Sequence, residues 1–142
     1  MKKYRRGYTQ GVFDMFHIGH LNLINRAKEY CDQLIVGVNS DILVKDYKKK
    51  ITVIPENERA IIVSNIKAVD KCIIVNTLDK EEIFKQLHFD AVFIGDDWAG
   101  DIRWIETEQR LKRVGVDVVF LPYTQNVSST ILRLEKEYKI DE

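Results

Sequence analysis

Short, continuous apolar runs alternate along this chain with longer segments in which apolar positions recur at helical spacing. The short runs are rich in β-branched residues and do not alternate polar with apolar positions. This pattern is typical of strands that are covered on both faces of a parallel sheet. It predicts strands over residues 8–13, 33–39, 71–75, 91–95 and 117–121.

Helices are predicted between these strands. Leu21, Ile24 and Ala27 fall on one face of a helix over residues 18–30. A helix over residues 55–68 begins at Pro55, which suits a first helical turn. Further helices are expected over residues 81–87, 102–113 and 128–138, whereas residues 40–42 are expected to form only a short turn.

The repeated order of strand and helix predicts an α/β fold. Right-handed crossovers would give a Rossmann-like, open, five-stranded parallel sheet with helices on both faces. The chain has 142 residues and shows no linker or low-complexity segment, so we expect a single domain over residues 1–142.

Composition and charge exclude several classes of function. Lysine plus arginine and aspartate plus glutamate number 22 each, so the net charge gives no general attraction to nucleic acid or to a membrane surface. No apolar run approaches the roughly 18 residues of a membrane helix. Cys31 and Cys72 lack metal-ligand spacing, which favours reduced thiols in a cytoplasmic protein.

Ligands of open parallel sheets bind beyond the carboxyl ends of the strands, so the loops after the strands carry the functional signal. The loop after the first strand places His17 and His20 three residues apart, just where a helix begins. Gly11 allows close approach of the backbone, and Gly19 leaves space for a phosphate oxygen. Two imidazole donors beside a helix N-terminus suit the charge that develops during phosphoryl transfer. The alternatives are a metal site, which lacks a third nearby ligand, and two surface histidines without function.

Three other loops suit phosphate or sugar. The lysine run from Lys48 to Lys50 is either a solvated face or a source of cations for a triphosphate. Arg59, on the following helix, would add a second contact to the phosphates. Gly95, Asp96, Asp97 and Trp98 follow the fourth strand, either as a capped loop or as a pocket for base and ribose. The last loop carries hydroxyl groups at the start of the final helix, which are either N-caps or an anion site, at Ser128, Ser129 and Thr130.

These segments together resemble the cytidylyltransferase group of the HxGH nucleotidyltransferase superfamily. Within that group the chain looks most like the glycerol-3-phosphate cytidylyltransferases. The resemblance rests on residues 11–20, on Asp41 with the lysine run 48–50, and on residues 68–73, 95–98 and 127–131, which span almost the whole chain in the order of the family.

The resemblance implies a reaction and a set of roles. The phosphate of a small phosphorylated alcohol would attack the α-phosphorus of CTP directly, with Mg²⁺, and pyrophosphate would leave. It also implies a homodimer and a product used for a cell-surface polymer. His17, His20 and Lys48 would be catalytic. The nucleotide-binding set would be Gly11, Val12, Phe13, Asp14, Lys50, Gly95, Asp96, Asp97, Tyr123, Thr124, Ser128, Ser129 and Thr130. The acceptor-binding set would be Asp14, Arg59, Lys67, Asp97 and Trp98.

Two departures from the family pattern affect the identity of the acceptor more than the chemistry. Lys67 and Tyr123 stand where the family usually has arginine, and neither supplies a bidentate guanidinium. Three alternatives therefore stay open. They are the same reaction with another phosphorylated acceptor (phosphocholine, phosphoethanolamine, a sugar phosphate or a flavin precursor), an adenylyltransferase, and a nucleotide-binding sensor without turnover.

Overall fold

The structure is a computed structural model that describes residues 2–122. Its elements, in chain order, are β1 (Tyr4–Gly11), α1 (Ile18–Tyr30), β2 (Cys31–Asn39), α2 (Asp41–Lys48), α3 (Glu56–Ser64), β3 (Lys71–Val75), α4 (Lys80–Leu87), β4 (Ala91–Gly95), η1 (Asp96–Trp98), α5 (Ile102–Arg113) and β5 (Asp117–Leu121).

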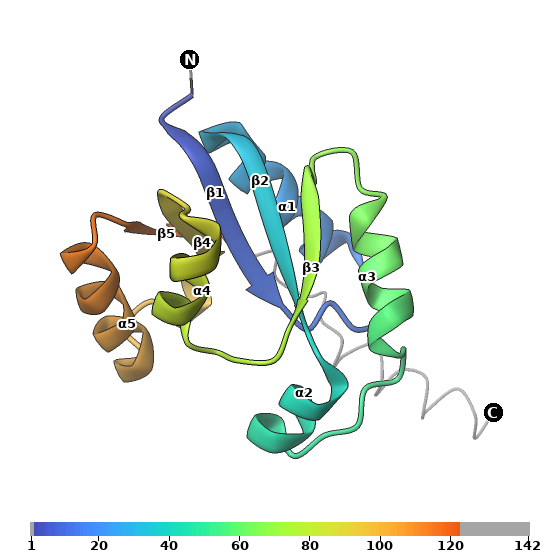
Figure 1. Cartoon of the computed structure of the whole chain (residues 1–142). Helices are drawn as coiled ribbons and strands as arrows, with labels where there is room; N and C mark the ends of the chain where they lie inside the picture. The colour runs from blue at the N-terminus through green and yellow to red at the C-terminus, as the bar shows by residue number, and fades with distance from the viewer. Residues whose placement is uncertain (1, 123–142) are drawn as a thin grey trace.

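The sheet has five parallel strands in the order β3-β2-β1-β4-β5. The chain builds outward from β1 to β3, crosses back, and continues through β4 to β5 (Figure 1). The strand order therefore reverses between β1 and β4, and their carboxyl ends flank the crevice where such folds bind ligands.

Two apolar clusters pack the helices onto opposite faces of this sheet. Ile24 and Ala27 of α1 join Val63 of α3 on one face, together with Leu34 and Val36 of β2. On the other face, Ile83 of α4 and Leu111 of α5 pack with Tyr8, Ile35 and Val92. The expected parallel sheet with helices on both faces is confirmed.

Most predicted elements are present, with three differences. Helix α2 (Asp41–Lys48) replaces the expected short turn, because Ser40 caps the helix by accepting a hydrogen bond from the Leu43 N–H. The helix that begins near Pro55 ends at Ser64, earlier than expected. Strand β1 ends at Gly11, because Phe13 takes a left-handed backbone conformation with φ 54°. The predicted helix over residues 128–138 lies outside the described residues.

Gly37 of β2 packs closely against the side chain of Tyr8 on the neighbouring strand β1. A Cβ atom built at this position would overlap the hydroxyl oxygen of Tyr8, a fully buried side chain. That hydroxyl donates a hydrogen bond to Gln10 Oε1 at 2.7 Å, so it is not free to move aside. Glycine at position 37 of β2 therefore leaves the space that the Tyr8 hydroxyl of the neighbouring strand β1 occupies.

We predict that Gly37→Ala lowers the free energy of unfolding by about 1–3 kcal/mol, because the added methyl group overpacks the core. Urea denaturation of the purified variants measures this loss. In a Tyr8→Phe background the same substitution should cost less, because the overlapping oxygen is gone. An equal cost in both backgrounds would mean that another contact sets the requirement for glycine.

Candidate active site

The loop after β1 is held in an unusual conformation next to the point where the strand order reverses. Phe13 and Met15 both have left-handed backbones, with φ 54° and φ 50°, which side chains other than glycine rarely adopt. Phe13 is held there by burial, since it is 4 % exposed, and its ring lies 6.3 Å from Phe16 and 5.4 Å from His20. The core thus fixes the loop that carries the two histidines.

His17 and His20 form a stacked pair at the start of α1. Their ring centroids lie 3.8 Å apart with an interplanar angle of 24°. His17 Nδ1 accepts a hydrogen bond from the Gly19 N–H at 3.0 Å, and His20 Nδ1 accepts one from the His17 N–H at 3.3 Å. This reciprocal arrangement caps the helix and fixes both rings.

The capping also decides where each ring carries its hydrogen. A backbone N–H can only donate, so each Nδ1 must present a lone pair, and the hydrogen of the neutral imidazole lies on Nε2. Burial lowers the pKa of His17, and it lowers the pKa of His20 to about 3 with help from His17 and the Lys48 ammonium. Both rings are therefore neutral near pH 7, and both offer an Nε2–H donor.

The Nε2 atom of His17 is buried and has no hydrogen-bond partner within residues 2–122. A buried donor without a partner is costly, so native structures rarely keep one without a functional reason. An anionic ligand oxygen would satisfy this donor, and the N-terminus of α1 beside it also favours negative charge. The expected phosphate site at His17 and His20 therefore has a free donor in place.

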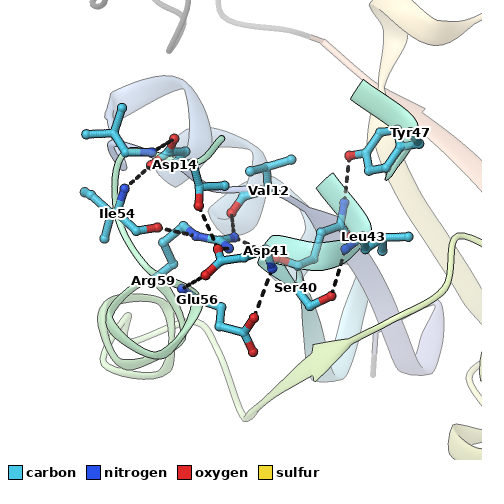
Figure 2. Close-up of polar contacts among 12 residues, drawn as sticks. Val12, Asp14, Ser40, Asp41, Leu43, Tyr47, Ile54, Glu56 and Arg59 are labelled. Carbon is cyan, nitrogen blue, oxygen red and sulfur yellow. Dashed lines mark hydrogen bonds and ion pairs between the residues drawn. The ribbon is translucent and has the colours of Figure 1, made fainter. Parts of the chain in front are cut away.

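Arg59 has a different role from the one that the sequence predicts. Its guanidinium is 1 % exposed and donates to the backbone carbonyls of Val12, Asn39 and Ile54 and to the carboxylate of Asp41 (Figure 2). These bonds occupy four of its five N–H groups. The expected contact between Arg59 and a phosphorylated substrate is therefore wrong, and Arg59 instead ties together the loops that surround the site.

Asp14 and Asp41 also serve the scaffold. The Asp14 carboxylate is 3 % exposed and accepts hydrogen bonds from the N–H groups of Val53 and Ile54, at 2.8 and 2.9 Å. Burial alone would raise the pKa of Asp41, but hydrogen bonds from Thr52 and Arg59 outweigh it and lower the pKa. The sequence analysis assigns Asp14 to nucleotide and acceptor binding. In the structure its carboxylate is instead bonded to the loop over residues 51–55.

A cavity of about 390 Å³ lies at the carboxyl edge of the sheet between β1, α2, α4 and α5. It is lined by Gln10, Gly11, Val12, Asn39, Tyr47, Lys48, Leu78, Lys80, Ile94, Trp98, Arg103, Trp104 and Thr107. Among residues 2–122, three cationic side chains and no carboxylate line it. The charge of Lys48 also contributes to the low pKa of His20, so the cavity and the histidine pair are neighbours.

Predicted residues fall in several places relative to this cavity. Gly11, Val12, Lys48 and Trp98 line it, as the sequence leads us to expect of a ligand site. Phe13 packs into the core. Lys50 is exposed, and so are Asp96 and Asp97 of η1, the short helix that follows Gly95. Partial burial and the charge of Asp96 raise the pKa of Asp97.

Lys67 is not near the histidines. It is exposed and lies between the end of α3 and the start of β3, where the Asp70 N–H donates to the Leu34 carbonyl at 3.0 Å. This is the amino edge of the sheet, opposite the cavity, so a contact of Lys67 with the same chain's substrate is wrong. Tyr123, Thr124, Ser128, Ser129 and Thr130 lie outside the described residues.

Lys80 is the main cavity residue that the sequence analysis misses. Lys80 is 7 % exposed, donates to the Leu78 carbonyl at 2.9 Å and lies 5.3 Å from the ring centre of Trp104. Burial lowers the pKa of Lys80 to about 8. Arg103 lies 5.7 Å from the ring centre of Trp98. The sequence could have located Lys80 through the loop after β3, because this loop ends at the same edge of the sheet as the other functional loops.

The described residues hold no group of three or more histidine, cysteine, aspartate or glutamate side chains that could bind a metal ion. A zinc site at His17 and His20 is thus unsupported in this part of the chain. Mg²⁺ differs, since it is usually held by substrate phosphates, water and one or two carboxylates. The exposed carboxylates of Asp96 and Asp97 fit that limited role. No helix over residues 2–122 is long and apolar enough to span a membrane.

Comparisons with known proteins agree with this geometry. Residues 8–135 match the family model described as cytidylyltransferase-like. An FAD synthase of Thermococcus sibiricus is 34 % identical over 123 residues, which cover 86 % of this chain and 83 % of that protein. The bifunctional protein HldE of Hyphomonas neptunium is 33 % identical over 92 % of this chain, which spans only 27 % of that longer protein. Neither relative is named a glycerol-3-phosphate cytidylyltransferase.

Solved structures show the same fold. A lipopolysaccharide core biosynthesis protein of Thermoplasma volcanium superposes with a TM-score of 0.72 at 24 % identity, over 87 % of this chain and 99 % of that chain. A pantothenate synthetase of Thermus thermophilus gives a TM-score of 0.64 at 15 % identity, over 99 % of this chain and 66 % of that chain. At these identities the likeness concerns the fold alone.

We predict that Arg59→Lys lowers the free energy of unfolding by about 3 kcal/mol, because lysine leaves buried carbonyls and part of the Asp41 contact unsatisfied. Urea denaturation measures the loss, and Arg113→Lys at an exposed position of α5 is the matched control. A loss no larger than that of the control would show that the four hydrogen bonds of Arg59 do not hold the loops together.

Proposed function

Since this chain belongs to the cytidylyltransferase-like family of nucleotidyltransferases, we propose that it joins CTP to sn-glycerol 3-phosphate, giving CDP-glycerol and pyrophosphate. One observation carries the proposal. Two neutral histidines with Nε2–H donors lie beside a cavity to which the described part of the chain contributes three cations and no carboxylate. This arrangement suits a triphosphate and a second phosphate brought together in one place.

The reaction needs little activation of the nucleophile. A phosphate oxygen of the acceptor attacks the α-phosphorus of the nucleotide, and the bond to the bridging oxygen of pyrophosphate breaks. Charge then accumulates on the oxygens of the α-phosphate, where the Nε2–H groups of His17 and His20 would donate. Because both rings are neutral and already held by backbone N–H groups, they need no reorientation during the step.

The cations would divide the two substrates between them. Lys48 is the cavity residue whose charge reaches His20, which suits contact with the triphosphate. Lys80 and Arg103 lie on the α4 and α5 side and would hold the phosphate of the acceptor. Mg²⁺ bound with the nucleotide would neutralise charge on its phosphates, and Asp96 or Asp97 would supply its protein ligand.

A second candidate is the transfer of an adenylyl group from ATP to FMN, which the FAD synthases among the relatives favour. Two observations support a smaller acceptor. The cavity of about 390 Å³ is near the lower end of volumes typical of ligand sites. Lys80 and Arg103 already lie over the rings of Trp104 and Trp98, which reduces the aromatic surface left for stacking a flavin.

A pyrophosphate-release assay separates these functions. CTP and ATP are each tested against sn-glycerol 3-phosphate, phosphocholine, phosphoethanolamine, a sugar phosphate and FMN. The highest kcat/KM for CTP with sn-glycerol 3-phosphate is the expected result. Faster turnover of ATP with FMN would instead establish the flavin reaction. Tight binding of CTP without turnover of any acceptor would favour a nucleotide sensor.

We predict that His17→Asn and His20→Ala each lower kcat about 100- to 1000-fold, because each removes a donor to the developing charge. Asparagine keeps an oxygen that can accept from the Gly19 N–H, so His17→Asn separates catalysis from helix capping. His88→Asn is the control, since His88 is the third histidine and ends α4 with φ 51°. Turnover near that of the wild type in both folded site variants would remove the histidines from the mechanism.

We predict that the KM for the acceptor rises as the pH increases through about 8. The pKa of Lys80 is lowered to about 8, so above that pH the amine is neutral and no longer attracts a phosphate dianion. Lys80→Met should raise the KM below pH 8 and remove most of its pH dependence. A steep rise that persists in Lys80→Met would assign the titration to another group.

A further inference from the structure

A chain of side-chain hydrogen bonds crosses the carboxyl edge of the sheet and ends at the cavity. Gln10 Nε2 donates to the Thr77 carbonyl at 3.0 Å and to Asn39 Oδ1 at 2.8 Å. Asn39 Nδ2 then donates to the Tyr47 hydroxyl oxygen at 3.0 Å (Figure 2). The chain therefore links the loop after β3, the ends of β1 and β2, and helix α2.

The chemistry of the groups fixes the direction of every bond in this chain. The Thr77 carbonyl can only accept, so the Gln10 atom that faces it must be the amide nitrogen. The other end of that amide, Oε1, accepts from the Tyr8 hydroxyl at 2.7 Å. Asn39 must then turn its oxygen to Gln10 and its nitrogen to Tyr47. The Tyr47 oxygen is left as the acceptor of the last bond.

The hydroxyl hydrogen of Tyr47 is consequently not used in this chain. Within residues 2–122, no side chain or carbonyl is recorded as accepting it, and Tyr47 lines the cavity together with Lys48, Lys80 and Arg103. Burial raises the pKa of Tyr47, so the phenol keeps its hydrogen at neutral pH. Among its cations the cavity thus contains a neutral hydrogen-bond donor, the Tyr47 hydroxyl, whose orientation is set by Asn39.

We propose that Tyr47 is a specificity-determining residue whose O–H donates to a phosphate oxygen of the acceptor, and that Gln10 and Asn39 are positioning residues that keep this hydrogen turned to the cavity. This proposal rests on the proposed nucleotidyl transfer and names a contact for its second substrate. A phosphate oxygen is the ligand group that matches the three cations that line the cavity.

The phosphate could belong to the acceptor or to the nucleotide, and steady-state kinetics distinguish the two. With sn-glycerol 3-phosphate and CTP, Tyr47→Phe should raise the KM of the acceptor about 10- to 100-fold, the usual effect of losing a hydrogen bond to a charged group. The KM for CTP should stay within about twofold. Tyr30→Phe, on the exposed end of α1, is the matched control. A rise confined to the KM for CTP would overturn the assignment to the acceptor.

Asn39→Asp tests the direction of the chain. A carboxylate can still accept from Gln10, but its second oxygen can only accept, so the Tyr47 hydrogen would turn away from the cavity. This variant should raise the acceptor KM as Tyr47→Phe does, and the double variant should be no worse than either one. Additive losses in the double variant would overturn the positioning role. Should Asn39→Asp fail to fold, Asn39→Ser, which shortens the chain, replaces it with the same expectation.

Binding of inorganic phosphate, measured by titration calorimetry, keeps the proposal independent of turnover. If the wild type releases no pyrophosphate with any pair of substrates, the proposed function fails, and phosphate affinity still decides the role of Tyr47. Phosphate binding that weakens about tenfold or more in Tyr47→Phe supports the contact. Equal affinity in the two proteins, or no phosphate binding to the wild type, overturns it.

Discussion

The burial of one guanidinium is the constraint on which the site depends. Three loops meet beneath the cavity at Val12, Asn39 and Ile54, and each brings a backbone carbonyl that needs a donor. Arg59 supplies all three from a single planar group and balances its own charge against Asp41. Arg59 thereby joins the loop that carries the histidines directly to the helix that carries Lys48. The position of the donors relative to one another thus follows from a buried residue that does not itself line the cavity.

Hydrogen-bond acceptors and donors lie in different parts of the site: the acceptors bind the scaffold and the donors face the cavity. The carboxylates of Asp14 and Asp41 and the carbonyls of the loops are bonded to the scaffold. The groups that face the cavity or the histidine pair include imidazole Nε2–H, ammonium, guanidinium and phenol. A site with this polarity attracts anions and gives little support to a cationic head group. This polarity is the reason that we propose a phosphorylated polyol and not phosphocholine as the acceptor.

Much of the fold could be predicted from the sequence, because strands covered on both faces appear as short, continuous runs rich in β-branched residues, and because parallel strands alternate with helices. The histidine loop could be located for the same reason, since ligands gather where the strand order reverses. Side-chain direction could not be predicted. Arg59 and Lys67 are cations near the right loops in sequence, yet one is buried beneath the site and the other lies at the opposite sheet edge. Helix α2 was missed because its start depends on a hydrogen bond from the Leu43 N–H to the Ser40 hydroxyl, and the sequence alone does not show that this bond forms.

In the loop between α2 and α3 the polar backbone is turned to the protein interior and apolar side chains are turned to solvent. Its backbone amides at Val53 and Ile54 point inward to Asp14, while the side chains of Ile51 and Val53 are 83 % and 50 % exposed. The backbone is thus anchored to the loop that precedes α1, and the side chains are left in solvent. Positions 51 and 53 are therefore suitable attachment points for a spectroscopic reporter. A probe placed there would move with the frame of the site while staying clear of the ligand.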